Sequence, residues 1–426
     1  MTAPQSATKR LTLKARYVFP VAAGPIRNGT VTVEGDRIAA VGGKTPEGEV
    51  LDLGNVAVLP GLVNAHTHLE FSHLAEPLGR PGMGFVAWIE EVIRHRRESR
   101  GQASEPVALG LQESVGAGTT ALGEIAQPGW KTEPFERAPL EATVFLELIA
   151  PTQRRIPAAL AAARSHVEAA GVSPSWRPGL SPHAPYSVHP ELLRRLVAIS
   201  SQRQVPIAFH LAESREEIEL LRHRSGPLRG FLKQIEGWNP NAIPANARPL
   251  DYLRMLSGAH RLLVIHGNYL DAEEIALMAS CRDRMAVVYC PRTHAYFGHD
   301  QYPLAKFLAA RVTVALGTDS RASSPDLSVL AEMRFLFRRG PPVPPAELLR
   351  LGTSSAARAL GLDAEAGSLE AGKWADFAVV PLPDRDAADP HELLFESDAP
   401  VVAAWFRGQA LAHRCIWEAD GLARRQ

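Results

Sequence analysis

The sequence predicts an α/β fold, a (β/α)8 TIM barrel with a small β-sandwich domain built from both ends of the chain. Apolar runs of strand length alternate with amphipathic helical stretches through the middle of the 426 residues, which is typical of parallel βαβ units. Short runs with alternating apolar residues lie near each end and indicate half-buried β-strands. Several central runs end in histidine or aspartate, as expected where barrel strands meet an active site.

The two ends of the chain are predicted to form the small domain. Residues 1–58 contain the runs LTLKARYVF, TVTVEGDRIAAVG and EVLDLGNVAVL. Gly35 and Asp36 give a hairpin turn signal between two alternating runs. Residues 363–426 return to the same pattern with GSLEAGKWADFAVV and APVVAAWFRGQALAH. Residues 59–362 are therefore assigned to the barrel.

Eight apolar runs are the predicted barrel strands. They lie at 56–66 and near 119–125, 143–149, 178–181, 206–210, 262–266, 285–289 and 313–318. Helices are predicted between them, for example at 105–117, 158–170, 189–201 and 271–280. The connection after the fifth run is unusually long, which is typical of a functional loop such as a lid. A doubly wound open sheet is the alternative, but it would carry a glycine-rich turn after its first strand, and the sequence has none there.

The composition, with 46% hydrophobic and 22% charged residues, is ordinary for a soluble globular protein. The formal net charge is zero, so no global field favours nucleic acid or an anionic membrane. The start, MTAPQSATKRLTLK, lacks an apolar segment of signal-peptide length, and no stretch approaches a membrane span. The three cysteines are Cys281, Cys290 and Cys415. They form no plausible disulfide framework, and a cytoplasmic location is expected.

The first predicted strand ends in a pair of histidines, His66 and His68. Residues two apart in an extended chain point to the same side, so both imidazoles leave the strand in one direction. Histidine is the commonest side chain for binding a borderline metal such as zinc. The pair is half of a metal site if other strand ends supply the rest, and a chance pair otherwise.

Three further strand ends supply suitable side chains. The fifth run ends IAFHLAES, with His210 at its end and Glu213 three residues on. The sixth ends LLVIHGN with His266, and the eighth ends VALGTDS with Asp319. A lone histidine at a strand end is more often a surface or core residue. Four such ends over one barrel rim, however, predict a metal site.

These motifs also resemble a known family. The matching pieces are PGLVNAHTHLEF, SPHAPYSVHPELL, FHLAES, VIHGN, YCP, LGTDSRASS and GSLEAGKWADFAVV. They are similar to the amidohydrolase superfamily, in its cytosine-deaminase-like and chlorohydrolase-like branch, and they follow the order of that family from about residue 51 to residue 380. The resemblance implies a metal-dependent hydrolase of carbon–nitrogen bonds other than peptide bonds, of the cyclic amidine deaminase type.

The resemblance implies that one divalent ion, zinc or alternatively ferrous iron, is ligated by four residues. These are His66, His68, His210 and Asp319. Binuclear members of the superfamily use a carboxylated lysine at the end of the fourth strand to bridge two metals. Here that strand ends GLSPHAPYS, and none of the lysines between the two metal-binding ends falls at a predicted strand end. These lysines are Lys131, Lys233 and Lys306. A mononuclear site is therefore predicted.

Three residues are expected to carry the chemistry. A divalent ion lowers the pKa of bound water toward neutrality. His266 and Asp319 are placed to hydrogen-bond this water and accept its proton. Glu213 is expected to protonate a ring nitrogen of the substrate and then the leaving amine, since a carboxyl group in a cleft can be tuned for this work. Otherwise Glu213 is a solvated residue at the start of the acidic helix REEIELL.

Some substrate-binding residues follow from the same resemblance. SPHAPYSVHPELL resembles adenosine-type deaminases that act on methylthioadenosine and adenosylhomocysteine, which implies that His183 contacts the substrate. Ser323 matches another substrate-contacting position. Trp88 could stack on a heteroaromatic ring or pack in the core. An acidic residue that binds ribose hydroxyls in some relatives has no secure counterpart in WIEEVIRHRRES.

Other segments point to a different substrate of the same class. HLEFSHL and CPRTHAYFGH look more like aminodeoxyfutalosine deaminases of the menaquinone route, whose substrate is an adenine nucleoside carrying a benzoate. Arg154 and Arg155 are expected on the rim just after the third strand, where they could form a bidentate clamp on a carboxylate; solvated arginines are the alternative. Further rim residues without a predicted role are Glu70, His73, His294 and His299.

The sequence therefore predicts a hydrolase that deaminates an adenine-type nucleoside at C6. Alternatives within the superfamily are a guanine deaminase, a triazine chlorohydrolase or aminohydrolase, and an amide hydrolase. The alternative of another class is a catalytically silent metal-binding barrel, against which the intact Glu213, His266 and Asp319 argue. The expected partner is a small-molecule substrate, with no nucleic acid and no membrane, and the family resemblance suggests a homodimer.

Overall fold

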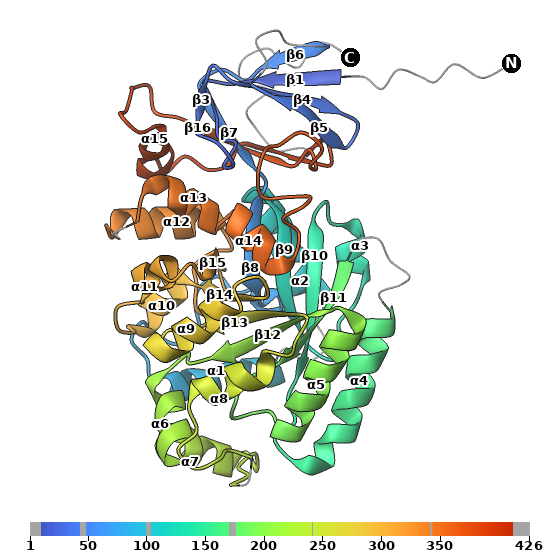
Figure 1. Cartoon of the computed structure of the whole chain (residues 1–426), viewed down its shortest axis with the longest axis vertical. Coiled ribbons are helices and arrows are strands. Elements are labelled where there is room, and N and C mark those ends of the chain that lie inside the picture. The colour runs from blue at the N-terminus through green and yellow to red at the C-terminus, as the bar shows by residue number, and fades with distance from the viewer. Residues whose placement is uncertain are drawn as a thin grey trace, which may run out of the picture.

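Eight buried apolar runs form one parallel sheet that curls into the barrel in the lower part of Figure 1. The computed structural model describes residues 10–42, 48–98, 104–169, 176–240, 242–340 and 343–411. The barrel strands are β8 (Leu62–Thr67), β9 (Thr119–Ala126), β10 (Glu141–Leu148), β11 (Trp176–Pro182), β12 (Pro206–Leu211), β13 (Arg261–His266), β14 (Met285–Tyr289) and β15 (Thr313–Leu316). Their near-continuous burial is what a parallel sheet covered on both faces requires.

The first and last barrel strands meet just beyond the end of β15. Each strand pairs with its sequence neighbour from β8 to β15. Thr67 then pairs in parallel with Asp319, and the Asp319 N–H donates to the carbonyl oxygen of His66 at 3.1 Å. These contacts confirm the predicted (β/α)8 barrel.

Helices cover the outside of the barrel and its mouth. They are α1 (Phe85–Glu98), α2 (Ser104–Gly116), α3 (Glu133–Arg137), α4 (Ile156–Ala169), α5 (Pro190–Arg203), α6 (Arg215–His223), α7 (Pro227–Gln234), α8 (Pro249–Leu256), α9 (Ala272–Ser280), α10 (Pro291–Phe297), α11 (Leu304–Ala309), α12 (Val329–Arg338), α13 (Pro345–Leu351), α14 (Ser354–Leu360) and α15 (Pro390–Glu396). The four predicted helices correspond to α2, α4, α5 and α9, except that residue 170 lies outside the described residues. The long connection after β12 folds into α6, α7 and α8.

The predicted first strand, 56–66, is wrong as a single element. It consists of β7 (Val56–Pro60) and β8, which belong to different sheets. Gly61 joins them, and a Cβ atom there would lie 2.0 Å from Thr120 Oγ1, so the chain crosses between the sheets where only glycine fits. Both strands are apolar and buried, and hydrophobicity therefore did not reveal the change of sheet.

Both ends of the chain contribute to two small sheets above the barrel (Figure 1). One contains β1 (Arg10–Lys14), β4 (Thr30–Glu34), β5 (Arg37–Val41) and β6 (Glu49–Asp52). The other contains β2 (Tyr17–Val18), β3 (Ile26–Arg27), β7, β16 (Phe377–Pro381), β17 (Ala403–Phe406) and β18 (Gln409–Leu411). Here β7 pairs with β16 from the other end of the chain, which confirms a small β-domain built from both termini. Its division from the barrel after residue 58 stays a prediction, and β7 runs through that position.

Charged and aromatic side chains join the small domain to the barrel. The carboxylate of Glu141, the first residue of β10, accepts hydrogen bonds from Arg177 Nε at 2.7 Å and from Arg407 Nη2 at 3.0 Å. The Arg407 guanidinium also lies 3.4 Å from the centre of the Trp374 ring. The small domain is thus fixed at the amino-terminal end of the barrel strands and leaves their carboxyl ends free for a site.

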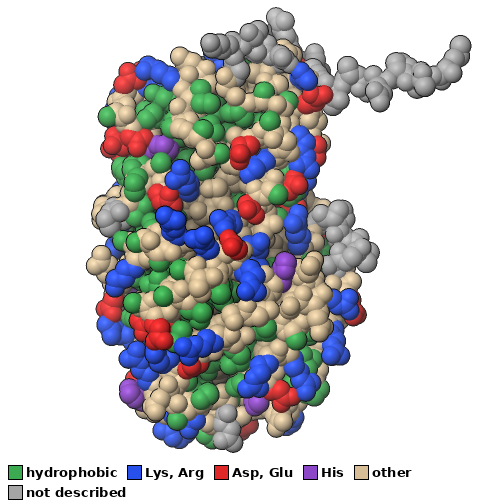
Figure 2. Space-filling model, viewed as in Figure 1, with side chains coloured by type: hydrophobic (Ala, Val, Ile, Leu, Met, Phe, Trp, Pro, Cys, Tyr) green, Lys and Arg blue, Asp and Glu red, His purple; other side chains and the backbone are tan. Residues whose placement is uncertain are grey.

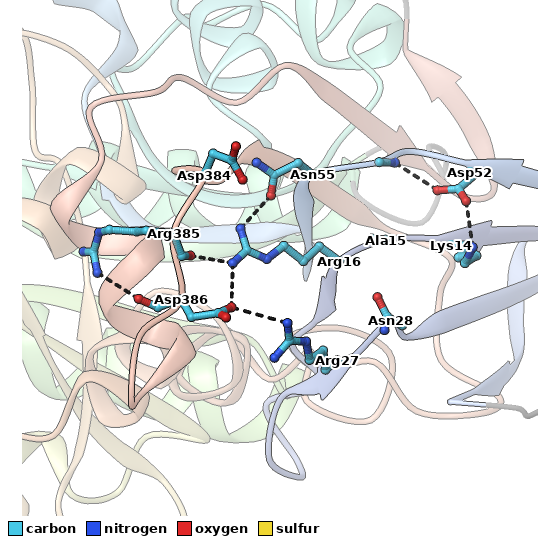
Figure 3. Close-up of a pocket in the computed structure, with 11 residues that line it drawn as sticks. Lys14, Ala15, Arg16, Arg27, Asn28, Asp52, Asn55, Asp384, Arg385 and Asp386 are labelled. Carbon is cyan, nitrogen blue, oxygen red and sulfur yellow. Dashed lines mark hydrogen bonds and ion pairs between the residues drawn. The ribbon is translucent and has the colours of Figure 1, made fainter.

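A polar cavity of about 510 Å³ is lined by residues of the small domain from both ends of the chain (Figure 3). Its charged side chains bind one another. Arg16 donates to Asn55 Oδ1 at 2.9 Å and to Asp386 Oδ1 at 3.0 Å, and Arg27 lies 3.4 Å from the same carboxylate. These pairings leave little charge for a ligand.

Basic and acidic side chains are interspersed over the face seen in Figure 2. No single-sign patch dominates that face, in keeping with the formal net charge of zero. Across the described ranges, every helix is too short or too polar to cross a bilayer.

Candidate metal centre and active site

Four histidines and an aspartate from four barrel strands meet at the carboxyl ends of the strands. His66 lies in β8 with His68 just beyond it, His210 lies in β12, His266 ends β13, and Asp319 follows β15. Ring nitrogens of His66, His68 and His210 lie within 4.8 Å of one another, and so do ligand atoms of His66, His266 and Asp319. The fold therefore brings together residues from separate parts of the sequence, as predicted for a single site.

The donor atoms of this cluster fit a metal ion. His66 is fully buried, and neither of its ring nitrogens has a hydrogen-bond partner. Burial, with the neighbouring His68 and His210, holds the pKa of His66 well below its usual value, so the imidazole is neutral and offers a lone pair. His210 Nδ1 lies 3.0 Å from the carbonyl oxygen of His183, which leaves Nε2 for the site. Buried neutral imidazoles beside a carboxylate are a donor set for a divalent ion.

The backbone is strained where it presents these side chains. Ala212, His266 and Asp319 all have positive φ angles, of 55°, 67° and 58°. Residues other than glycine rarely adopt this region, and such positions cluster at functional sites. Each of the three follows or ends a barrel strand, so the strain turns the chain sharply over the metal centre.

Asp319 is held by two hydroxyl groups. Ser323 Oγ donates to Asp319 Oδ2 at 3.4 Å, and Thr293 Oγ1 lies 2.9 Å from Ser323 Oγ. Ser323 is 1% exposed and faces the carboxylate. The expected contact of Ser323 with the substrate stays a prediction, since the structure shows this hydroxyl bound to Asp319.

Glu213 faces His266 across the site. Glu213 Oε1 lies 3.4 Å from His266 Nε2. Burial, reinforced by the nearby Asp319, raises the pKa of Glu213 well above its usual value. A carboxyl group whose pKa is raised in this way is suited to acid–base work, the role that the sequence leads us to expect for this residue.

The turn that carries Glu213 is held by two residues that the sequence reasoning missed. The carboxylate of Glu217 in α6 accepts the backbone N–H groups of Ala212 and Glu213, each at 2.9 Å. Asn268 Nδ2 donates to the carbonyl oxygen of Glu213 at 2.8 Å. Glu217 is fully buried, and an acidic residue on the buried face of an amphipathic helix was the signal that could have revealed it.

The loop that carries the histidine pair is held by another missed residue, Glu124 in β9. Its carboxylate accepts Thr67 Oγ1 at 2.7 Å and the Leu69 N–H at 3.0 Å. Thr67 and Leu69 flank His68, so Glu124 fixes the direction of that imidazole. A glutamate inside the apolar run 119–125 needs a buried partner, and the same is true of Glu147 in the run 143–149.

A cavity of about 250 Å³ opens over the metal centre. Its apolar wall comes mainly from α1 and α7 and contains Phe71, Phe85, Trp88, Ile89, Val92, Ile93, Ile149, Tyr186, Phe231, Leu232 and Ile235. Its polar lining contains His68, Arg96, Glu147, His183, Ser187, His210, Glu213, His266, Asp319 and Ser320. Aromatic walls with a few convergent polar groups are typical of a small-molecule site, and helices of the long connection form part of the wall.

Of the four predicted substrate contacts, Trp88 and His183 line this cavity, whereas Arg154 and Ser323 are not part of its described lining. Trp88 is fixed by a hydrogen bond from Nε1 to the carbonyl oxygen of Ala322 at 3.1 Å, and His183 lies beside the metal centre. Arg154 is exposed in a short 3-10 helix and is not part of the described lining. Arg96 is the arginine of that lining, and its guanidinium binds Glu70 at 2.6 Å. A carboxylate clamp at Arg154 stays a prediction.

The other rim residues lie outside the lining of the cavity. His73 Nε2 lies 2.9 Å from His95 Nε2. His299 Nδ1 lies 3.1 Å from the Tyr269 hydroxyl, and His294 is buried beside it with ring centres 5.4 Å apart. Arg155 is exposed. No lysine occurs among the described residues that line the cavity, and β11 is followed by His183 rather than by lysine, which is consistent with a mononuclear site.

Known proteins share this architecture and about a third of the aligned sequence. The model of the amidohydrolase family matches residues 57–411. A 5-methylthioadenosine/S-adenosylhomocysteine deaminase of Moorella thermoacetica is 31% identical over 90% of this chain and 87% of its own length. An aminodeoxyfutalosine deaminase of Deinococcus radiodurans is 31% identical over 78% of this chain and 81% of its own.

The fold is also that of a solved structure. The crystal structure of Helicobacter pylori aminofutalosine deaminase in complex with methylthio-coformycin superposes with a TM-score of 0.82. It covers 94% of this chain and all of its own, at 22% identity. The family match extends over most of the chain and includes the whole metal centre. The chain therefore belongs to the amidohydrolase family, as a deaminase that hydrolyses carbon–nitrogen bonds other than peptide bonds.

Proposed function

We propose that the protein converts an adenine-type nucleoside to the 6-oxopurine and ammonia, with one divalent ion, zinc, held by His66, His68, His210 and Asp319. The observation that carries this proposal is the Glu213–His266 pair, 3.4 Å apart, beside the metal centre in a cavity with aromatic walls. Imidazole nitrogen with one carboxylate is a zinc-type donor set, and ferrous iron is the alternative.

The residues of the cavity match the steps of this reaction. When bound, a divalent ion lowers the pKa of a water molecule and so provides the nucleophile. His266 and Asp319 would hold a water molecule at the metal centre and take one of its protons as its oxygen adds to C6. Glu213 would give its proton to the adjacent ring nitrogen, take a second proton from the added oxygen and pass it to the exocyclic amine, so that the C6–N bond breaks and ammonia leaves. The proton held by His266 and Asp319 would then return Glu213 to its starting state.

The walls of the cavity support a planar substrate. Trp88 and Phe85 stand on α1 with ring centres 6.3 Å apart, and Phe231 faces the same space from α7. Such surfaces bind a heteroaromatic ring and exclude water from the reacting carbon. His183 is held by Ser187 at 2.7 Å and points a ring nitrogen into the cavity, where it contacts the substrate.

Ammonia release tests the proposal. Zinc-loaded protein is incubated with adenosine, methylthioadenosine, adenosylhomocysteine, aminodeoxyfutalosine and guanine, with metal-stripped protein as the control. We expect ammonia from at least one adenine compound, only with metal present. Ammonia from guanine alone, or from none of the five, would overturn the proposal. Two relatives with 31% identity are a 5-methylthioadenosine/S-adenosylhomocysteine deaminase and an aminodeoxyfutalosine deaminase. Methylthioadenosine, adenosylhomocysteine and aminodeoxyfutalosine are therefore the first substrates to test.

A catalytically silent barrel is the competing function. Such a protein has no need for a carboxyl group of raised pKa beside a metal centre, and the Glu213–His266 pair therefore favours catalysis. A cytoplasmic location, suggested by the sparse cysteines, and a homodimer stay predictions.

A further inference from the structure

Glu147 places a buried carboxylate in the wall of the catalytic cavity. It lies near the end of β10 and is 2% exposed. Gln127 Nε2 donates to Glu147 Oε2 at 2.5 Å. The other oxygen, Oε1, lies 4.0 Å from His183 Nε2, and both residues line the cavity. One oxygen is thus fixed by the protein while the other is directed toward the histidine.

The carboxylate of Glu147 lies 4.0 Å from nitrogen atoms of both Arg96 and His183. Burial alone would raise its pKa, but His183 and Arg96 outweigh burial and hold the pKa of Glu147 below its usual value. Arg96 is nevertheless bound mainly to Glu70, through contacts of 2.6 and 3.3 Å, and comes no closer than 4.0 Å to Glu147. One guanidinium is therefore shared between two carboxylates, and Glu147 Oε1 keeps room to accept a hydrogen bond from a group in the cavity.

The gap between Glu147 and His183 fits a group that both donates and accepts a hydrogen bond. A separation of 4.0 Å is too long for a direct hydrogen bond, but one oxygen atom can lie within about 2.8 Å of both atoms. His183 Nδ1 lies 2.7 Å from Ser187 Oγ, which fixes the ring so that Nε2 faces the gap. When Nε2 carries the proton, the gap offers an acceptor on one side and a donor on the other, the pattern that matches a hydroxyl group.

We propose that Glu147 Oε1 and His183 Nε2 together hold a sugar hydroxyl of the substrate, so that the enzyme selects ribonucleosides over free bases. This inference rests on the proposed function and narrows its substrate class. Guanine and the triazines carry no hydroxyl that could occupy the gap. Gln127 is a positioning residue in this arrangement, because it holds Glu147 Oε2 and so directs Oε1 toward the substrate.

Deoxynucleosides test the proposal directly. The ratio kcat/KM is measured for adenosine, 2′-deoxyadenosine, 3′-deoxyadenosine and adenine. With the unchanged protein, loss of at least one hydroxyl should lower kcat/KM by about tenfold to a hundredfold, as expected for a hydrogen bond to a charged group. Glu147→Gln keeps the shape and an oxygen for Gln127 but replaces the acceptor with an amide. It should lower kcat/KM for adenosine to the level of that deoxy analogue and remove the difference between the two.

The matched control is Glu90→Gln, an exposed glutamate on α1, which should keep the full preference for adenosine. Zinc content and melting temperature are measured for each variant to confirm that the metal centre and the fold are intact. The proposal is overturned if the unchanged protein treats adenosine and both deoxy analogues alike, or if Glu147→Gln retains the preference.

A binding measurement separates this inference from the proposed reaction. If no adenine compound releases ammonia, the proposed function fails. Calorimetric titration of the zinc-loaded protein with adenosine, its two deoxy analogues and adenine still tests whether Glu147 binds a sugar hydroxyl. Adenosine should bind about tenfold or more tightly than one deoxy analogue and than adenine, in the unchanged protein but not in Glu147→Gln. Equal affinities, or no binding of adenosine, would refute the inference.

Discussion

The carboxylate of Glu217 accepts the backbone N–H of Glu213 at 2.9 Å and so holds the turn that carries the proposed proton shuttle. Its second oxygen accepts the N–H of Ala212, whose φ angle is 55°. The strained turn is thus secured by a residue one helical turn further along the chain. Glu217 does not line the cavity among the described residues, and its influence on the reaction passes through the position of Glu213.

Glu217→Gln should therefore lower kcat without removing the metal. The amide keeps one acceptor but directs an NH2 group at a backbone N–H, which displaces Glu213, and small displacements of a reacting group cost on the order of tenfold to a hundredfold in rate. Steady-state kinetics should show the loss in kcat with KM nearly unchanged. Glu216→Gln, the neighbouring residue, is the matched control and should behave like the unchanged protein. Equal kinetics for the two variants would contradict the positioning role.

Glu213→Gln should abolish most of the turnover and leave the zinc content unchanged. The amide cannot carry the proton to the ring nitrogen or to the leaving amine, and the loss of a general acid–base group lowers rates by about 10²- to 10⁴-fold. Ammonia release and metal analysis on the same preparation provide the check. Turnover within a factor of about two of the unchanged protein would remove Glu213 from the mechanism.

Glu124→Gln should weaken metal binding. Glu124 holds Thr67 and the Leu69 N–H on either side of His68, and loss of such supporting contacts typically lowers metal affinity about 10- to 100-fold. Competition with a chromogenic chelator measures the zinc dissociation constant. Thr67→Ser keeps the hydroxyl that donates to Glu124 and should retain more of the affinity than Thr67→Val. An unchanged constant in Glu124→Gln would show that the loop positions His68 without this contact.

Removal of the metal should destabilise the fold. Without an ion the buried ring nitrogens of His66 lack partners, and an ion that binds only the folded state adds about 2.7 kcal/mol of stability at a hundredfold excess over its Kd. Thermal melting of chelator-treated protein should therefore shift upward as zinc is titrated back. His210→Ala should reduce that shift. A melting temperature independent of zinc would argue against a metal at this cluster.

Asp376 should make the fold more stable in mildly acidic solution. Burial raises the pKa of Asp376 to about 7, while Arg407 N–H donates to Oδ1 at 2.7 Å and Oδ2 has no partner. The folded state binds the proton more tightly than the unfolded state, so this contribution is full below the ordinary value of 3.8 and is lost as the pH rises through about 7. The asparagine in Asp376→Asn does not titrate. Urea unfolding at about pH 5 and about pH 8 measures the free energy of unfolding of both proteins, and we expect the variant to be more stable relative to the unchanged protein at pH 8 than at pH 5. An equal difference at the two pH values would contradict the assignment.

The sequence by itself determined the barrel and its metal centre. Apolar runs alternating with helices specify parallel strands, and in a parallel barrel every strand ends on the same rim. The positions of His66, His68, His210, His266 and Asp319 relative to their strands were therefore sufficient to bring them together, as the structure confirms. The same periodicity placed Trp88 on the helix that lines the cavity.

Only the tertiary structure decided which residues support these groups and what fills the cavity wall. Glu124, Glu147 and Glu217 are single acidic residues in otherwise apolar surroundings, and their partners lie on other elements or in strained turns that local patterns do not specify. The separation of β7 from β8 depends on the approach of Thr120 to Gly61, and the exposure of Arg154 depends on how the chain leaves β10. Periodicity fixes which face of an element is buried, whereas the partner of a buried charge is fixed by packing between elements far apart in the chain.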